Sequence, residues 1–151
     1  MINKIKITLF TCLLLLCSCS KQSSKVEYLQ SDENEQNNYP FSEAVKVGDI
    51  IYLSGQIGTS SENDGGLVSG GIREETRQTM LNIKNTLEKY DSKMDDIIKC
   101  TCMLADIKEW AAMSEEYIKF FPNHKPARSA FAGTGLALGA RVEIECIAKI
   151  D

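Results

Sequence analysis

One arginine of this chain has a setting that suits chemistry. Arg128 lies in residues 125–131 (KPARSAF), between a proline and an apolar run. A guanidinium group can bind a carboxylate or a phosphate through two parallel hydrogen bonds. The residues alone leave a structural alternative open, in which Arg128 is exposed at a loop end or pairs with Glu143 or Glu145 on the strand that follows.

The other reactive side chains form no such pattern. His124 is the only histidine and there is no Cys-x-x-Cys motif, so no structural zinc site is expected. The three cysteines beyond residue 19, an odd number and a poor disulfide framework, are Cys100, Cys102 and Cys146. On a strand, Cys100 and Cys102 point to the same face as Ile98 and Leu104, and we expect all three thiols to be buried.

The first 20 residues (MINKIKITLFTCLLLLCSCS) have the layout of an export signal. Lys4 and Lys6 precede an apolar run at residues 7–16, which is shorter than the roughly 20 residues of a membrane-spanning helix. The run ends in Leu-Cys-Ser-Cys, which resembles a bacterial lipoprotein box; the alternative is a plain cleaved signal. We therefore expect residues 1–18 to be removed and Cys19 to be acylated, so that lipid chains anchor the protein to the bacterial cell envelope.

The charge of the chain argues against nucleic acid as a partner. Lysine and arginine total 17 and aspartate and glutamate total 21, giving a net charge of −4. Loss of Lys4 and Lys6 with the signal would bring the net charge to −6. Such a surface attracts neither a phosphate backbone nor anionic lipid, so membrane attachment would depend on the acyl chains alone.

The length of 151 residues accommodates one domain. Residues 19–38 are polar and predict a lipidated N-terminus and tether, with a possible short edge strand at 26–29. The domain proper is expected at 39–151. It opens with two β-rich runs separated by Gly48-Asp49, a hairpin signal. The loop that follows lacks the Gly-Lys-Ser/Thr ending of a phosphate-binding loop.

Two helices are predicted by apolar spacing. In residues 73–90 the face that should be buried holds Thr76, Met80, Ile83, Leu87 and Tyr90. A second helix starts at Asp106, with Glu109 completing a capping box, and Pro122 ends it. Its buried stripe is predicted to be Trp110, Met113, Tyr117 and Phe120.

The strands complete the predicted fold. Residues 97–105 form an apolar strand. In the last strand Val142, Ile144, Cys146 and Ala148 alternate with Arg141, Glu143, Glu145 and Ile147. The order β-β-α-β-α-β-β predicts an α+β fold, a single mixed sheet with two helices on one face. The second face has no covering layer in one chain, so we expect the protein to oligomerise.

Five segments, in this order and at compatible spacing, resemble the Rid family of reactive intermediate (enamine/imine) deaminases. They are YLSGQIG (52–58), GGIREETRQTMLNIKNTLE (70–88), IIKCTCMLADIKEWAAMSEEYIKFFP (97–122), PARSAF (126–131) and VEIECIAKI (142–150). The resemblance covers residues 39–150. It implies a chorismate-mutase-like fold and a homotrimer with sites in the clefts between adjacent subunits, which would cover the second sheet face.

The resemblance also assigns roles to residues. Arg128 of the Pro-x-Arg-Ser motif would bind the α-carboxylate of the substrate, and Glu143 would position or polarise the attacking water. Ser54 and Gly55 match the site strand. The implied reaction converts an enamine to its imine, adds water to the imine carbon and releases ammonia, leaving a 2-keto acid. No metal or organic cofactor is implied.

Two positions depart from the family pattern. The family's Gly-Pro-Tyr-Ser-Gln reads Tyr-Pro-Phe-Ser-Glu at 39–43, so Phe41 replaces a site tyrosine, and Tyr39 would point to the same side. The family's Val-Asn-x-x-Tyr reads Met-Ser-Glu-Glu-Tyr at 113–117, so Ser114 replaces an asparagine. Besides an imine deaminase, two functions therefore stay open. One is a non-catalytic ligand-binding or regulatory trimer that recognises a small carboxylate, and the other is a trimeric scaffold at the membrane surface.

Overall fold

The computed structural model describes residues 25–150, so the signal, Cys19 and the rest of residues 1–24 lie outside the described residues. The elements run in the order β1 (Val26–Leu29), α1 (Asp32–Gln36), β2 (Ala44–Val47), β3 (Ile50–Leu53), β4 (Gln56–Ile57), α2 (Ile72–Lys89), β5 (Ile97–Leu104), α3 (Trp110–Tyr117), β6 (Ala127–Ala132) and β7 (Val142–Lys149). Single turns of 3₁₀ helix flank several of them, at residues 61–63, 94–96, 107–109, 118–120 and 137–139.

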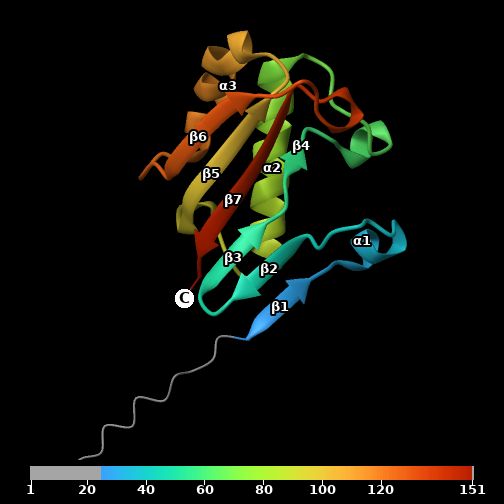
Figure 1. Cartoon of the computed structure of the whole chain (residues 1–151), viewed down its shortest axis with the longest axis vertical. Coiled ribbons are helices and arrows are strands. Elements are labelled where there is room, and N and C mark those ends of the chain that lie inside the picture. The colour runs from blue at the N-terminus through green and yellow to red at the C-terminus, as the bar shows by residue number, and fades with distance from the viewer. Residues whose placement is uncertain (1–24, 151) are drawn as a thin grey trace, which may run out of the picture.

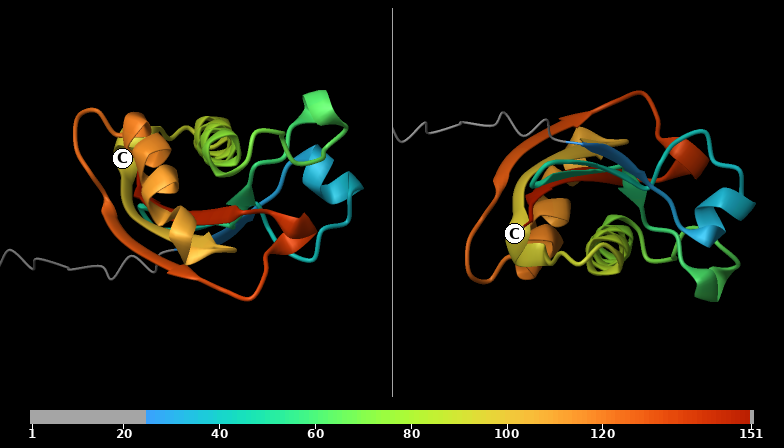
Figure 2. Two further views of the ribbon diagram at one scale, coloured as in Figure 1. Left: turned by 90° about the horizontal axis from the view of Figure 1, so that it is seen from above. Right: turned by 90° about the horizontal axis from the view of Figure 1, so that it is seen from below.

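The strands form one mixed sheet in the order β1-β2-β3-β7-β5-β6, and β4 also pairs with β7 (Figure 1). β5 and β6 are parallel, and the other pairs are antiparallel. Helices α2 and α3 lie on the same face, and neither covers the opposite face (Figure 2). The predicted α+β fold is confirmed.

The core lies between the sheet and the two helices. In β7 the four residues predicted to face inward are buried, and those that alternate with them face away from the helices. In α2, Met80, Ile83 and Leu87 are fully buried. Each such apolar side chain stabilises the fold by about 1.5–3 kcal/mol relative to its exposed state. All three thiols are buried and unpaired, as predicted.

Two local details differ from the prediction, and one predicted helix cap is confirmed. The register between β5 and β7 shifts between Ile97 and Lys99, so Ile97 is buried and Ile98 is exposed. Asp106 does cap the turn that precedes α3, because its carboxylate accepts from the Lys108 amide. Glu109 does not complete a capping box, since its carboxylate is bound by the Arg141 guanidinium.

The predicted stripe of α3 is also different at both ends. Met113 and Tyr117 are buried as expected. Phe121 is the fully packed phenylalanine, at 3% exposure, while Phe120 is only partly buried. Trp110 is 45% exposed, so it contributes one face to the protein and leaves the other open.

The segment interpreted as a tether contains more structure than its composition predicts. β1 pairs with β2 along its full length, as expected for an edge strand at residues 26–29. Helix α1 follows, and its buried Asn34 donates a hydrogen bond to the Phe41 carbonyl at 3.2 Å. The sheet therefore begins at β1, whereas the domain was expected to start at residue 39. No helix within residues 25–150 is long and apolar enough to span a bilayer.

A carboxylate ties this N-terminal segment to α2. Glu43 Oε1 accepts hydrogen bonds from Ser31 Oγ at 2.9 Å and Lys89 Nζ at 2.8 Å, and Glu43 Oε2 accepts one from Tyr90 Oη at 2.5 Å. Burial by itself raises the pKa of Glu43, but the hydrogen bonds from Lys89, Tyr90 and Ser31 outweigh it and lower the pKa. The segment leading to Phe41 is thereby fixed to the end of α2.

We expect Glu43→Gln to lower the free energy of unfolding at pH 7 by about 1–2 kcal/mol, because a neutral amide weakens these charge-assisted bonds. The folded-state pKa of Glu43 lies below its ordinary value of 4.5. Its contribution is therefore complete above that value and is lost as the pH falls through the folded-state pKa.

The measurement is the melting temperature of wild type and Glu43→Gln between pH 7 and about pH 3. The difference should be largest near neutrality and shrink in acid. Glu62→Gln, at an exposed glutamate, is the matched control and should leave the melting temperature unchanged. A difference for Glu43→Gln that stays constant down to about pH 3 would contradict this account.

Candidate functional site

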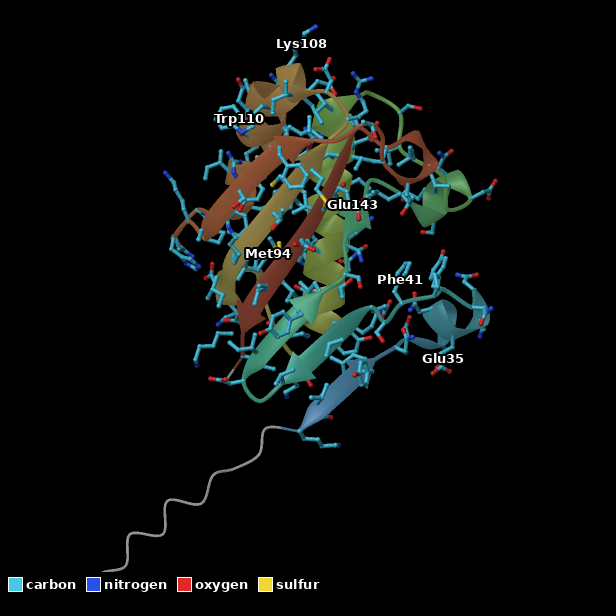
Figure 3. All side chains as sticks on the ribbon, in the orientation of Figure 1. Glu35, Phe41, Met94, Lys108, Trp110 and Glu143 are labelled. Carbon is cyan, nitrogen blue, oxygen red and sulfur yellow. The ribbon has the colours of Figure 1, made fainter. Side chains whose placement is uncertain are left out.

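Four of the six residues assigned to the site line one hollow. The hollow has a volume of about 220 Å³ and is lined by Phe41, Ser54, Gly55 and Glu143. Figure 3 shows Phe41 and Glu143, which come from the segment before β2 and from the start of β7. Residues far apart in the sequence therefore lie together around this hollow.

A β-bulge shapes the floor of the hollow. β3 and β4 both pair with β7, with Tyr52 opposite Ile147 and Gln56 opposite Ile144. The path from Tyr52 to Gln56 advances by four residues while β7 advances by three, so one extra residue is accommodated between the two strands. Ser54 and Gly55 lie in this bulge.

Gly55 lets the Glu143 carboxylate lie directly against the backbone. A Cβ atom added at Gly55 would overlap Glu143 Oε1, and it would lie 3.0 Å from Cδ and 3.1 Å from Cγ of the same side chain. The absence of a Cβ atom at Gly55 permits this close approach. The carboxylate is thus held at the surface of the hollow.

Ser54 is fixed by two hydrogen bonds. Its hydroxyl donates to the Ser42 carbonyl at 2.7 Å, and its amide donates to the Glu43 carbonyl at 3.0 Å. Because the hydroxyl proton is engaged, the remaining capacity of Ser54 Oγ is to accept a hydrogen bond. A ligand in the hollow therefore meets a hydrogen-bond acceptor at Ser54 Oγ and the carboxylate of Glu143.

Arg128 and Ser114 form a second group on the other side of the sheet. Arg128 lies opposite the buried Cys100 in the pairing of β6 with β5, so its side chain extends on the face covered by α3. Its Nη2 donates to Ser114 Oγ at 3.1 Å, and its Nη1 lies 4.0 Å from Met113 Sδ. The Arg128 Cζ lies 4.9 Å from the centroid of the Tyr117 ring.

Arg128 has no acidic partner in the described part of the chain. The other three arginines each form ion pairs, Arg73 and Arg77 with glutamates of α2 and α3 and Arg141 with Glu109. No ion pair among residues 25–150 includes Arg128, so the structural alternative, a partnership with Glu143 or Glu145, is not what the fold adopts.

The thiols beneath Arg128 belong to the core. The hydrogen bond shared with Cys146 lowers the pKa of Cys100, and the positive charge of Arg128 acts in the same direction. Burial raises the pKa of Cys102 to about 12. Burial and the neighbouring thiols raise the pKa of Tyr117, whose hydroxyl is also buried. Within residues 25–150, no group of three or more His, Cys, Asp and Glu side chains is placed to hold a metal ion.

One chain does not bring the two groups together. Glu143 alternates with buried residues of β7 and so faces away from the helices, whereas Arg128 faces them. The strands that carry them are separated by β5, and neighbouring strands lie about 4.8 Å apart. A small molecule cannot touch both the Glu143 carboxylate and the Arg128 guanidinium of the same chain.

Sequence reasoning missed one aromatic contribution to these groups, that of Trp110, and correctly predicted the direction of Tyr39. Trp110 was assigned to the core, but its ring lies under the Arg128 guanidinium, with Cζ 5.3 Å from the ring centroid. The spacing of Trp110, Ser114 and Tyr117, four and then three residues apart, could have indicated a shared face toward one partner. At the hollow, the Tyr39 and Phe41 rings stack with centroids 5.5 Å apart, so Tyr39 does point to the same side as Phe41.

Comparison with known proteins places the chain in a family. The family described as Endoribonuclease L-PSP matches residues 33–150. The chain is 34% identical to Reactive Intermediate Deaminase A, chloroplastic, of Arabidopsis thaliana, over 88% of this chain and 71% of that protein. It is 39% identical to human 2-iminobutanoate/2-iminopropanoate deaminase, over 72% of this chain and 79% of that protein.

A solved structure agrees with this placement. RidA from the Antarctic bacterium Psychrobacter sp. PAMC 21119 superposes with a TM-score of 0.70 at 29% identity, covering 86% of this chain and all of that one. The chain belongs to the Rid family, the same family that carries the endoribonuclease L-PSP description.

The Gly55 contact predicts that Gly55→Ala moves the Glu143 carboxylate while leaving the melting temperature nearly unchanged. The added methyl group should displace the Glu143 carboxylate by about 1 Å or more, because the obstructing atoms are the end of a flexible side chain. The cost of moving that side chain is offset by the lower entropy of the unfolded alanine variant, about 0.4–1 kcal/mol. Thermal unfolding and a crystal structure of the variant are the measurements.

Gly135→Ala is the matched control, since an added Cβ there would meet nothing within 4 Å. It should leave both the melting temperature and the Glu143 position unchanged. A Gly55→Ala variant in which Glu143 keeps its position, or one that unfolds many degrees earlier, would show that the hollow is not arranged as described.

Proposed function

We propose that the protein deaminates small imino acids by hydrolysis, with enamines entering as their imine tautomers. The observation that carries the proposal is Arg128, a partly buried guanidinium with no carboxylate partner among residues 25–150. A 2-imino acid supplies the missing anion, because its carboxylate matches the guanidinium fork. The names of the relatives from Arabidopsis and human support the same reaction.

The reaction needs one water and one acid-base group. With the carboxylate held by Arg128, the imine carbon lies over the hollow, and Glu143 accepts a proton from the attacking water. Water adds to the imine carbon to give a tetrahedral carbinolamine. Glu143 passes the water proton to the imine nitrogen, which completes the carbinolamine. Glu143 then takes the proton of the new hydroxyl group and delivers it to the amino nitrogen as the C–N bond breaks, so the products are ammonia and a 2-keto acid. Ser54 Oγ can accept a hydrogen bond from the substrate nitrogen.

We propose that two copies of the chain share each site, in a homotrimer. The support is that Arg128 and Glu143 of one chain lie on opposite faces of the sheet, so a site that contains both needs a second copy. The uncovered face also carries large exposed side chains, Tyr28, Tyr52 and Phe131, at 72%, 46% and 51% exposure. Such a face is suited to burial against other copies.

A small carboxylate suits the site better than RNA, despite the description of the family. The net charge of the chain is −4, and Glu143 and Glu145 lie on the uncovered face. These charges oppose the approach of a phosphate backbone. A ligand-binding trimer without turnover would use the same contacts, and it is distinguished by binding a 2-keto acid without releasing ammonia from an imino acid.

The test is ammonia release from enzymatically generated 2-iminobutanoate and 2-iminopropanoate. Arg128→Ala and Glu143→Gln should each lower kcat/KM by roughly 100-fold or more, since each loses charge-assisted bonds of about 1.5–3 kcal/mol. Arg128→Lys should lose most of the activity as well, because an ammonium cannot reproduce the planar fork. Wild type that binds 2-keto acids but releases no ammonia would favour the non-catalytic alternative.

Mixing the two inactive chains tests whether the site is shared. In a trimer that contains both Arg128→Ala and Glu143→Gln chains, one of the three sites should combine an intact Glu143 from one chain with an intact Arg128 from another. Differently tagged chains, co-expressed and purified through both tags, should therefore recover about a third of the wild-type activity. Mixed assemblies as inactive as their parents would overturn the shared site.

We further propose that the protein is exported and anchored to the bacterial cell envelope through Cys19. The support is the sequence, an apolar run of h-region length followed by Leu-Cys-Ser-Cys at 16–19. Attachment would depend on acyl chains, which hold a protein stably when there is more than one.

Cys19→Ala should move the protein from the membrane fraction to the soluble fraction and abolish incorporation of a fatty-acid probe. Cys12→Ala, within the apolar run, is the matched control and should change neither result. Unchanged fractionation and labelling of Cys19→Ala would show that Cys19 is not the anchor.

A further inference from the structure

The side chain of Arg128 is held by aromatic rings. β6, which carries Arg128, is an edge strand, and the guanidinium reaches from it to α3. Its Cζ lies 5.3 Å from the centroid of the Trp110 ring and 4.9 Å from that of the Tyr117 ring. Both distances are within the range of a cation–π interaction.

This arrangement holds the cation without neutralising it. A carboxylate at this position would bind the guanidinium fork and compete with any acidic ligand. An aromatic face attracts the positive charge but accepts no strong hydrogen bond from its N–H groups. Ser114 Oγ and Met113 Sδ accept one N–H each, and a guanidinium group has five, so donors remain for a ligand.

The two rings differ in what else they do. Tyr117 is 3% exposed and packs against the ring of Phe121, with centroids 4.9 Å apart, so it belongs to the core. Trp110 is 45% exposed and lies at the first position of α3 (Figure 3). Its large apolar ring was expected to be buried but is partly exposed. The Arg128 guanidinium lies against this ring.

We propose that Trp110 is a positioning residue for the reaction: it holds the Arg128 guanidinium against α3 so that the N–H groups not bound to Ser114 are presented to the substrate carboxylate. The inference rests on the proposed function, in which Arg128 binds that carboxylate. Trp110 acts through Arg128 and does not contact the reacting atoms. Its loss should therefore weaken substrate binding more than it slows the chemical step.

Steady-state kinetics of ammonia release provide the first test. We expect Trp110→Ala to raise KM by about threefold to tenfold while kcat changes by less than about twofold. Trp110→Phe keeps an aromatic face and should restore part of the loss, whereas Trp110→Leu keeps only the apolar bulk and should not. Ile107→Ala is the matched control, because Ile107 is 52% exposed in the preceding turn.

A purely structural role for Trp110 predicts a different result. In that case Phe and Leu would restore KM equally, and the changes in KM would follow the changes in melting temperature. That outcome, or a KM unaffected by Trp110→Ala, would overturn the inference while leaving the deaminase function in place.

Fluorescence provides a test that does not depend on turnover. Trp110 is the only tryptophan of the chain, so the intrinsic emission reports directly on the ring beside Arg128. Titration of wild type with 2-oxobutanoate should give a saturable change in emission, and the same change should appear in Ile107→Ala. Arg128→Ala, which keeps Trp110, should give none.

The two tests separate the inference from the function. A saturable emission change in a protein that releases no ammonia would support the Trp110–Arg128 contact and refute the deaminase. Ammonia release with no emission change, and with unaltered kinetics in Trp110→Ala, would refute the positioning role of Trp110 and leave the deaminase function in place.

Discussion

The positive charge of Arg128 organises the candidate site. A guanidinium removed from water is costly unless another group replaces its hydration, and most proteins supply a carboxylate. This fold supplies aromatic faces, a serine hydroxyl and a methionine sulfur. These groups are weaker partners than a carboxylate, so the charge stays available. Arg73, Arg77 and Arg141 show the contrast, since each forms an ion pair with a glutamate of α3 or of the turn before it.

The two-residue period of β-strands imposes the second constraint. Arg128 shares a face with the buried Cys100, and Glu143 lies on the face opposite to Val142 and Ile144. No change of side-chain rotamer can bring the two groups together across the sheet. The proposed chemistry therefore depends on assembly, and the face that lacks a helix is the surface available for it. Burial of the uncovered sheet face and the proposed chemistry would then both require a second copy of the chain.

Helices and strands were predictable from the sequence where one hydrophobic periodicity extended through the whole element. α2 was expected at residues 73–90 and is found at Ile72–Lys89, because its apolar spacing is unbroken over five turns. β7 was expected from the alternation of apolar and polar residues, and buried and more exposed residues do alternate along it. These patterns reflect burial against the core, which dominates the energy of a long element.

Local geometry was not predictable to the same degree. The irregularity at Ile98 depends on pairing with another strand, and the exposure of Trp110 depends on how α3 meets β6. Glu109 binds Arg141, which is 32 residues away in the sequence, in preference to a nearby amide. The helix at Asp32–Gln36 is stabilised by contacts to Phe41 rather than by an apolar stripe of its own. Periodicity carries no information about such distant partners.

The two departures from the family pattern have different structural consequences. Ser114 is shorter than asparagine, yet its hydroxyl accepts a hydrogen bond from the Arg128 guanidinium at 3.1 Å, so a serine is long enough for this contact. Phe41 has no hydroxyl to offer, and its half-exposed ring lines the hollow beside Glu143. The nearly parallel stack with Tyr39 fixes that ring without returning a hydroxyl to the lining. Arg128 thus has a hydroxyl partner on α3, while the lining beside Glu143 is apolar at Phe41, the position where the resemblance implies a tyrosine.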